Sequence, residues 1–169
     1  MDVKYSRVSV FFTLATQITL NLFAWFNYWG WWGLERYHTD TYFILFPLGV
    51  IFFDGILILN LVRLITQSGY YKSCFAAYII STILMIVSFA FLYSSTGVGV
   101  EVNGRMYPEY DMRSCIYFSV ITWTSLGYGD IFPLEPSRLW VMIEVFFGSL
   151  HMGLLIGLAT HYFSRKSKI

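Results

Sequence analysis

The sequence predicts an all-α membrane protein with four transmembrane helices and one shorter re-entrant helix. Of the 169 residues, 57% are hydrophobic and 12% are charged, whereas a soluble domain usually carries about 25% charged residues. Four apolar stretches reach the length of about 20 residues that a membrane-spanning helix needs, namely 8–29, 42–64, 74–93 and 139–163. A fifth stretch, 112–124, is too short to cross but long enough for a helix that enters and leaves on one side.

The first stretch is expected to stay in the protein rather than to be removed as a signal peptide. Its apolar run is longer than the hydrophobic region of a signal peptide, and no small-residue cleavage site follows it. Instead it runs into an aromatic cluster typical of a membrane–water interface, made of Trp25, Tyr28, Trp29, Trp31 and Trp32.

The basic residues predict the orientation of the helices. With the amino terminus inside the cell, seven of the 11 Lys and Arg residues fall on the cytoplasmic side, as the positive-inside rule requires. These are Lys4, Arg7, Arg63, Lys72, Arg165, Lys166 and Lys168. We therefore expect a multi-pass protein of the cell membrane with both termini in the cytoplasm. Seven acidic residues then fall outside, where they would concentrate cations; ordinary loop polarity is the alternative explanation.

The loop before the short stretch carries a turn signal. Asn103-Gly104 lies between alternating residues from Val100 to Tyr107, which favours a β-hairpin, with a plain turn as the alternative. Cys74 and Cys115 fall about a bilayer thickness apart in this topology, so we expect two buried thiols and no disulfide.

The most informative segment lies between the short stretch and the last span and reads Trp123-Thr124-Ser125-Leu126-Gly127-Tyr128-Gly129-Asp130. Two glycines flank one aromatic residue, and glycine tolerates the conformations that turn successive carbonyl groups toward one axis. Rings of backbone carbonyls replace the hydration shell of K⁺ in selectivity filters. The segment therefore predicts K⁺ as the substrate, passive conduction and several chains around one pore.

From the third span to the fourth, residues 74–163 resemble the pore domain of potassium channels. The filter of that family reads threonine, valine, glycine, tyrosine, glycine, and the matching residues here are Ser125, Leu126, Gly127, Tyr128 and Gly129. The resemblance implies a homotetramer whose filter, Thr124 to Gly129, binds K⁺ through the Ser125 hydroxyl and the carbonyls of Ser125, Leu126, Gly127 and Tyr128. Ser125 keeps the hydroxyl of the family's threonine, and Leu126 replaces a β-branched residue, so we expect K⁺ selectivity to be kept.

The resemblance also assigns the supports of the filter. Residues 112–124 become the pore helix, whose negative C-terminal end would stabilise a cation at mid-membrane, and residues 125–130 become the filter. Tyr117 and Phe118 match paired aromatics behind the filter, and Tyr117 is expected to hydrogen-bond Asp130.

The inner helix, 138–163, carries three glycines and several polar residues. Gly148 lies at the spacing of the family's gating hinge, with close packing as the alternative, whereas Gly153 and Gly157 form a small-xxx-small pattern that favours packing. Glu144 is expected to pair with the pore helix or, alternatively, to tune the charge of the cavity. The predicted cavity lining is one helical face, made of Ser149, Met152, Ile156 and Thr160. His151 and His161 do not have the spacing of a helical metal pair, so K⁺ is the only expected metal.

Residues 1–72 hold two extra transmembrane helices, and residues 73–169 hold the pore domain. The extra helices are not expected to be a voltage sensor, because a sensor needs several arginines along one helix, and the second has only Asp54 inside it and Arg63 at its end. Asp54 is expected to pair with Gln17 or Asn21 of the first span; a regulatory site is the alternative.

These observations predict a K⁺-selective channel that conducts passively, contacts membrane lipids and is not gated by a voltage sensor. The alternative is a nonconducting or transporter-associated membrane subunit that keeps the pore fold for assembly. The sequence contains no catalytic, cofactor-binding or nucleic-acid-binding motif, so we expect neither an enzyme, nor a cofactor other than the permeant K⁺, nor a nucleic-acid partner.

Overall fold

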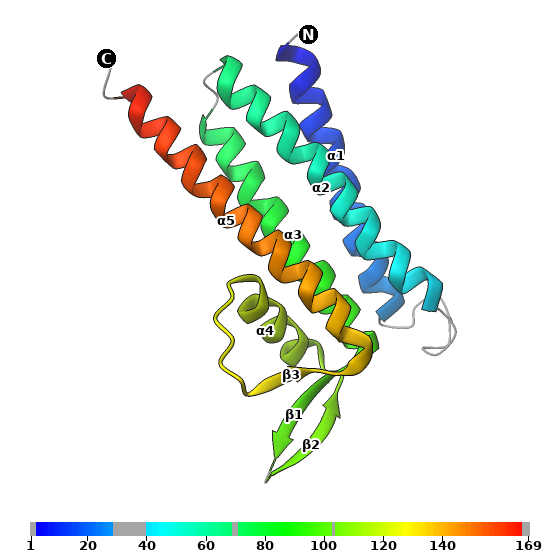
Figure 1. Ribbon diagram of the computed structural model, residues 1–169. Helices are drawn as coiled ribbons and strands as arrows, with labels where there is room; N and C mark the ends of the chain where they lie inside the picture. The colour runs from blue at the N-terminus through cyan, green and yellow to red at the C-terminus, as the bar shows by residue number, and fades with distance from the viewer. Residues whose placement is uncertain (1–2, 29–39, 69–70, 103, 167–169) are drawn as a thin grey trace. The chain divides into compact units, whose positions relative to one another are not determined.

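The computed structural model describes residues 3–28, 40–68, 71–102 and 104–166, and helices make up most of them (Figure 1). The chain divides into two compact units, Met1–Ser95 and Thr96–Ile169. The third helix is thereby grouped with the first two, whereas the predicted division after residue 72 follows the family resemblance and stays a prediction. The predicted interfacial residues Trp29, Trp31 and Trp32 lie outside the described residues.

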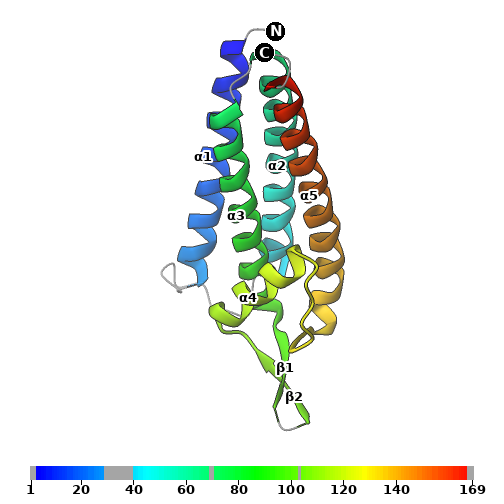
Figure 2. The ribbon, with the colours of Figure 1, turned by 90° about the vertical axis from the view of Figure 1, so that its left-hand side faces the viewer.

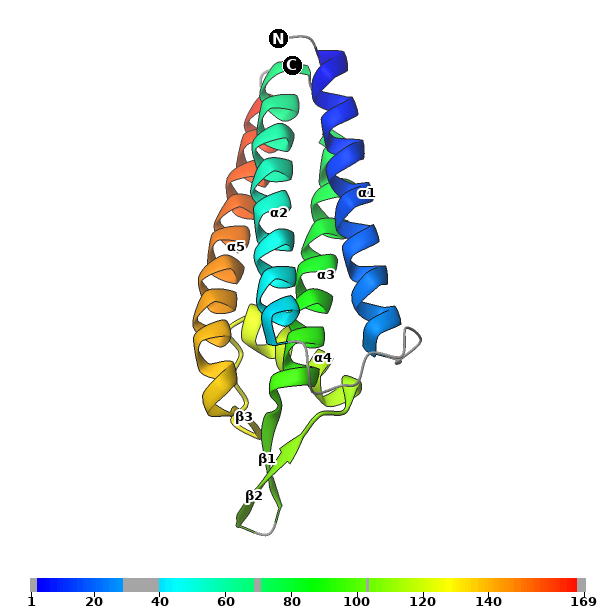
Figure 3. The same cartoon turned by 90° about the vertical axis from the view of Figure 1, so that its right-hand side faces the viewer.

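The first unit consists of three long helices, α1 (Val3–Tyr28), α2 (Asp40–Ser68) and α3 (Tyr71–Thr96). α1 and α2 pack against each other and run in opposite directions (Figure 3). Neither α1 nor α3 contains a proline or glycine that would interrupt it. α3 ends immediately before Gly97, whose φ of 81° is the left-handed conformation that commonly terminates helices.

A buried polar cluster joins the three helices of this unit. The Gln17 Nε2 atom donates to the Asp54 Oδ1 atom at 3.5 Å, and the Ser81 hydroxyl contacts the same Asp54 atom and, at 3.2 Å, the Gln17 Oε1 atom. The expected pairing of Asp54 with Gln17 is confirmed. Asn21 bonds elsewhere, because its Oδ1 atom accepts from the Ser88 hydroxyl of α3 at 3.0 Å. Polar residues of α1 are thus fixed to both α2 and α3.

The second unit contains two helices and a small sheet. Its helices are α4 (Met112–Trp123) and α5 (Arg138–Lys166), and its strands are β1 (Val98–Val102), β2 (Arg105–Glu109) and β3 (Ile131–Pro133), followed by the short 3-10 helix η1 (Glu135–Ser137). β1 lies between β2 and β3 and is antiparallel to both. Figure 2 shows the β1–β2 hairpin. The hairpin expected from Asn103-Gly104 is confirmed, whereas no sequence pattern indicated the third strand, which is only three residues long.

Two helical stretches are long and apolar enough to cross a membrane among the described residues, Cys74–Thr96 and Glu135–Ser164. They agree with the third and fourth predicted spans. Within α1 and α2 the described apolar stretches are shorter, Val10–Leu22 and Leu48–Val62, so the first two spans stay a prediction.

Candidate functional site

The start of α4 is fixed by a chain of acidic residues at the end of β2. The Asp111 carboxylate caps the helix by accepting from the Arg113 amide at 3.0 Å. The amides of Tyr110 and Asp111 in turn donate to the Glu109 Oε1 atom at 2.9 and 2.8 Å. An N-cap side chain satisfies an amide that the helix leaves open, so this contact sets the residue at which α4 begins.

The end of α4 is bonded to the residues that follow it. The amides of Thr124, Ser125 and Leu126 donate to the carbonyls of Val120, Thr122 and Ile121 at 3.1, 3.0 and 2.9 Å. The last carbonyls of a helix have no partner within the helix, and here the amides of the following residues supply three donors to them. Thr124 is therefore the cap of α4 rather than its last helical residue, one position short of the predicted end. The Thr124 end of segment 124–130 is anchored to α4.

The backbone of this segment alternates between two conformations. Ser125, Gly127 and Gly129 have φ values of 55°, 50° and 79°, and the residues between them do not take positive φ. When left-handed and right-handed residues alternate, successive peptide amides point to one side of the chain and successive carbonyls to the other. The glycine positions were expected from the sequence, whereas a positive φ at Ser125 was not.

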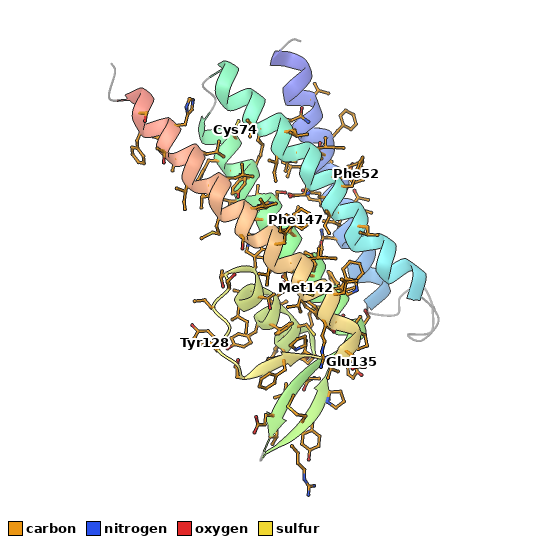
Figure 4. The ribbon with its side chains drawn as sticks, in the orientation of Figure 1. Phe52, Cys74, Tyr128, Glu135, Met142 and Phe147 are labelled. Atoms are coloured by element: carbon orange, nitrogen blue, oxygen red, sulfur yellow. The ribbon has the colours of Figure 1, made fainter. Side chains whose placement is uncertain are left out.

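Residues 124–130 are all exposed within the single chain, and the side chain of Tyr128 is 67% exposed on the loop shown in Figure 4. This exposed loop leaves the carbonyl row open to a ligand or to neighbouring chains.

The Asp130 end of the segment is held by Tyr117, as the family resemblance implied. The Tyr117 hydroxyl donates to the Asp130 Oδ2 atom at 2.8 Å. This hydrogen bond is the main reason that the pKa of Tyr117 is raised above its ordinary value, so the phenol keeps its proton and remains a donor at neutral pH. Phe118, the neighbouring aromatic, is buried.

One face of α5 contacts α4 through three residues spaced i, i+4 and i+7. Glu144, fully buried, accepts a hydrogen bond from Ser119 at 2.5 Å. The ring of His151 meets the ring of Trp123 edge to face, with centroids 5.0 Å apart. Between them lies Gly148, where an added Cβ would sit 2.3 Å from the Trp123 carbonyl oxygen. We call this set of contacts the helix seam.

The helix seam decides between alternatives that the sequence left open. It supports pairing of Glu144 with the pore helix, and it explains Gly148 by close approach of two backbones; a hinge at Gly148 stays a prediction. The contact of His151 with Trp123 was missed, although the common helical spacing of residues 144, 148 and 151 was a signal for it.

The predicted cavity-lining residues lie on the part of α5 that the described chain leaves uncovered. All four, Ser149, Met152, Ile156 and Thr160, are exposed. An added Cβ at Gly153 or Gly157 would meet nothing within 4 Å in the described part of the chain, so the packing role expected of these glycines stays a prediction.

The chemistry of the remaining residues is limited. Burial, followed by the charges of Asp111 and Glu109, raises the pKa of Cys115 to about 12, which keeps its thiol protonated. Within the described ranges, no group of three His, Cys, Asp or Glu residues is arranged to hold a metal ion.

Comparison with known protein families agrees with this geometry. A family model described as an ion channel matches residues 79–165, just over half of the chain. The chain therefore belongs to this ion channel family, whose pore is of the potassium-channel type with two membrane helices. The family is not a class of enzymes. Neither the curated proteins nor the solved structures yielded a match.

Proposed function

We propose that the chain is one subunit of a K⁺-selective channel in which four copies surround a single pore. The observation that carries this proposal is the alternation of positive φ at Ser125, Gly127 and Gly129. It is the backbone pattern that directs successive carbonyls to one side, and K⁺ filters coordinate the ion with such carbonyls. The K⁺ ligands would be the Ser125 hydroxyl and the carbonyls from Ser125 to Tyr128.

A tetramer accounts for the exposure of this segment in the single chain. A carbonyl row on one chain offers ligands on one side only, whereas four rows around an axis would enclose the ion. The same assembly would place the exposed residues Ser149, Met152, Ile156 and Thr160 of α5 around a water-filled cavity. Below the filter, the C-terminal ends of four α4 helices would add negative potential that favours a cation.

The proposed topology has four spans with the filter on the outer side of the cell membrane and both termini in the cytoplasm. α1 and α2 contain 26 and 29 residues, and at about 1.5 Å per residue each exceeds the hydrocarbon thickness of about 30 Å. Their exposed apolar side chains, such as Phe11, Phe12 and Phe52, suit contact with lipid. Conduction is passive and does not depend on a voltage sensor.

The test is ⁸⁶Rb⁺ flux into liposomes for the wild type and for Gly127→Ala. Alanine in the left-handed conformation costs about 1–2 kcal/mol per chain, or about 4–8 kcal/mol for four chains, so we expect the flux to be lost. Gly104→Ala is the matched control, because Gly104 also has positive φ and open space around it but lies in the hairpin.

The outcomes separate the candidate functions. Selective flux in the wild type and in Gly104→Ala, with none in Gly127→Ala, supports the channel. Full flux in Gly127→Ala contradicts the filter assignment. A folded, assembled wild type that passes no ion points to the nonconducting subunit instead.

A further inference from the structure

The outer end of segment 124–130 is attached to the small sheet by backbone pairing. Ile131 directly follows Asp130, and it pairs with Val100 in the register of β1 and β3. At the inner end, the Leu126 amide is bonded to the Ile121 carbonyl at 2.9 Å. Only residues 127–130 separate these two anchored positions.

A buried serine after β3 bonds to the residues just before β1, next to the β1–β3 pairing. Ser137 is fully buried, and its hydroxyl oxygen lies 2.6 Å from the Gly97 carbonyl oxygen and 2.8 Å from the Thr96 hydroxyl. A carbonyl can only accept and a serine has one hydroxyl proton. The Ser137 hydroxyl therefore donates to the Gly97 carbonyl and also lies within hydrogen-bond distance of the Thr96 hydroxyl. Since Gly97 precedes β1 and Ser137 follows β3, this pair of bonds ties together the segments that the two strands also join.

Gly97 allows the two segments to approach closely. Its φ is 81°, and an added Cβ would lie 2.7 Å from the Tyr110 Cε1 atom and 2.9 Å from the Leu134 Cδ1 atom. A side chain at this position would crowd the Tyr110 ring and the Leu134 side chain, and it would also be strained by the positive φ.

We propose that Thr96, Gly97, Ser137 and the β1–β3 pair form a clasp that positions the outer end of the filter, which makes Ser137 a positioning residue for K⁺ selectivity. This inference rests on the proposed channel function. Its physical basis is the shortness of the bridge: each residue spans at most about 3.6 Å, so four residues held at both ends cannot follow a shift of the outer anchor without rotating their peptide planes. Rotated carbonyls would no longer match the size of K⁺.

The test compares the ratio of K⁺ to Na⁺ permeability, measured from reversal potentials in bilayers, for wild type, Ser137→Ala and Ser94→Ala. Ser94 is the matched control, because it is also buried and its hydroxyl donates to the Phe91 carbonyl at 2.7 Å, within its own helix. One net hydrogen bond corresponds to about a fivefold change in an equilibrium constant. We expect the permeability ratio to fall by about fivefold or more in Ser137→Ala and to stay unchanged in Ser94→Ala.

A wild-type ratio in Ser137→Ala would overturn the clasp while leaving the channel function standing. A wild type without K⁺ selectivity would overturn the channel function and the clasp together. If Ser137→Ala does not fold, the pair Thr96→Val and Thr96→Ser decides, because valine keeps the shape of threonine without its hydroxyl and serine keeps the hydroxyl. Selectivity preserved by Thr96→Ser and reduced by Thr96→Val supports the clasp, and equal ratios in the two variants refute it.

Discussion

Replacing Gly148 with alanine is expected to disturb the proposed filter from the C-terminal end of α4. The new methyl group would lie 2.3 Å from the carbonyl oxygen of Trp123 and 3.1 Å from its carbonyl carbon. Both are backbone atoms, so no side-chain rotation can relieve the clash. Because Trp123 is the last residue of α4 and Thr124 begins the proposed filter, the displacement would pass directly into segment 124–130.

The size of the effect follows from the contact distance. A carbon atom approaches a carbonyl oxygen to about 3.3 Å, so the two helices would have to separate by about 1 Å. Overpacking of this kind costs about 1–3 kcal/mol, with the upper part of the range expected against backbone. The better helix propensity of alanine recovers about 1 kcal/mol. The net destabilisation is then about 1–2 kcal/mol.

Thermal unfolding in detergent and ⁸⁶Rb⁺ flux in liposomes measure the two consequences. Gly55→Ala in α2 is the control, because an added Cβ there meets nothing within 4 Å and gains the same helix propensity. We expect Gly148→Ala to melt at lower temperature than wild type and to conduct poorly, while Gly55→Ala does neither. A Gly148→Ala protein that melts and conducts like wild type would refute the proposed role of this close approach.

Three further changes test separate parts of the structure. Tyr117→Phe removes the bond to Asp130 and is expected to shorten K⁺ currents without preventing assembly. Since this bond raises the pKa of Tyr117, the bond in the wild type should be lost only at a pH above the ordinary phenol pKa of about 10. Wild-type currents that shorten between pH 7 and 9 through this group would contradict the assignment. Cys115, with its pKa raised to about 12, should react with iodoacetamide at pH 8 only after denaturation, as mass spectrometry would show; labelling of the native protein would be evidence against its burial. Asp54→Ala removes the acceptor shared by Gln17 and Ser81 and should lower the free energy of unfolding by about 1 kcal/mol, measured by titration with denaturing detergent, whereas an unchanged value would show that the polar cluster adds no stability.

Sequence motifs predicted those features of the candidate site whose residues lie close together in the chain. The glycines at positions 127 and 129 indicate a left-handed backbone conformation, because few other residues tolerate it. Tyr117 lies in the middle of α4, and its bond to Asp130, 13 residues away, was expected from the family resemblance. The pairing of Glu144 with α4 was one of two alternatives and was favoured by the family resemblance; the bond from Ser119 agrees with it.

Contacts between distant segments were harder to foresee. Ser137 is 40 residues from Gly97, and neither residue belongs to a pattern that signals a bond. β3 has three residues, which is too short for an alternating pattern to identify. Gly148 resembled a hinge in the sequence because glycine suits both bending and close approach, and only the distance to Trp123 shows that close approach occurs here.

The central claim is that segment 124–130 makes the assembled protein selective for K⁺, and the reversal potential of the purified protein in planar bilayers tests it most directly. With mostly K⁺ on one side and mostly Na⁺ with a little K⁺ on the other, the proposed channel should reverse close to the K⁺ equilibrium potential, and Gly104→Ala should behave in the same way. A reversal potential near zero, showing equal passage of both ions, would contradict the claim.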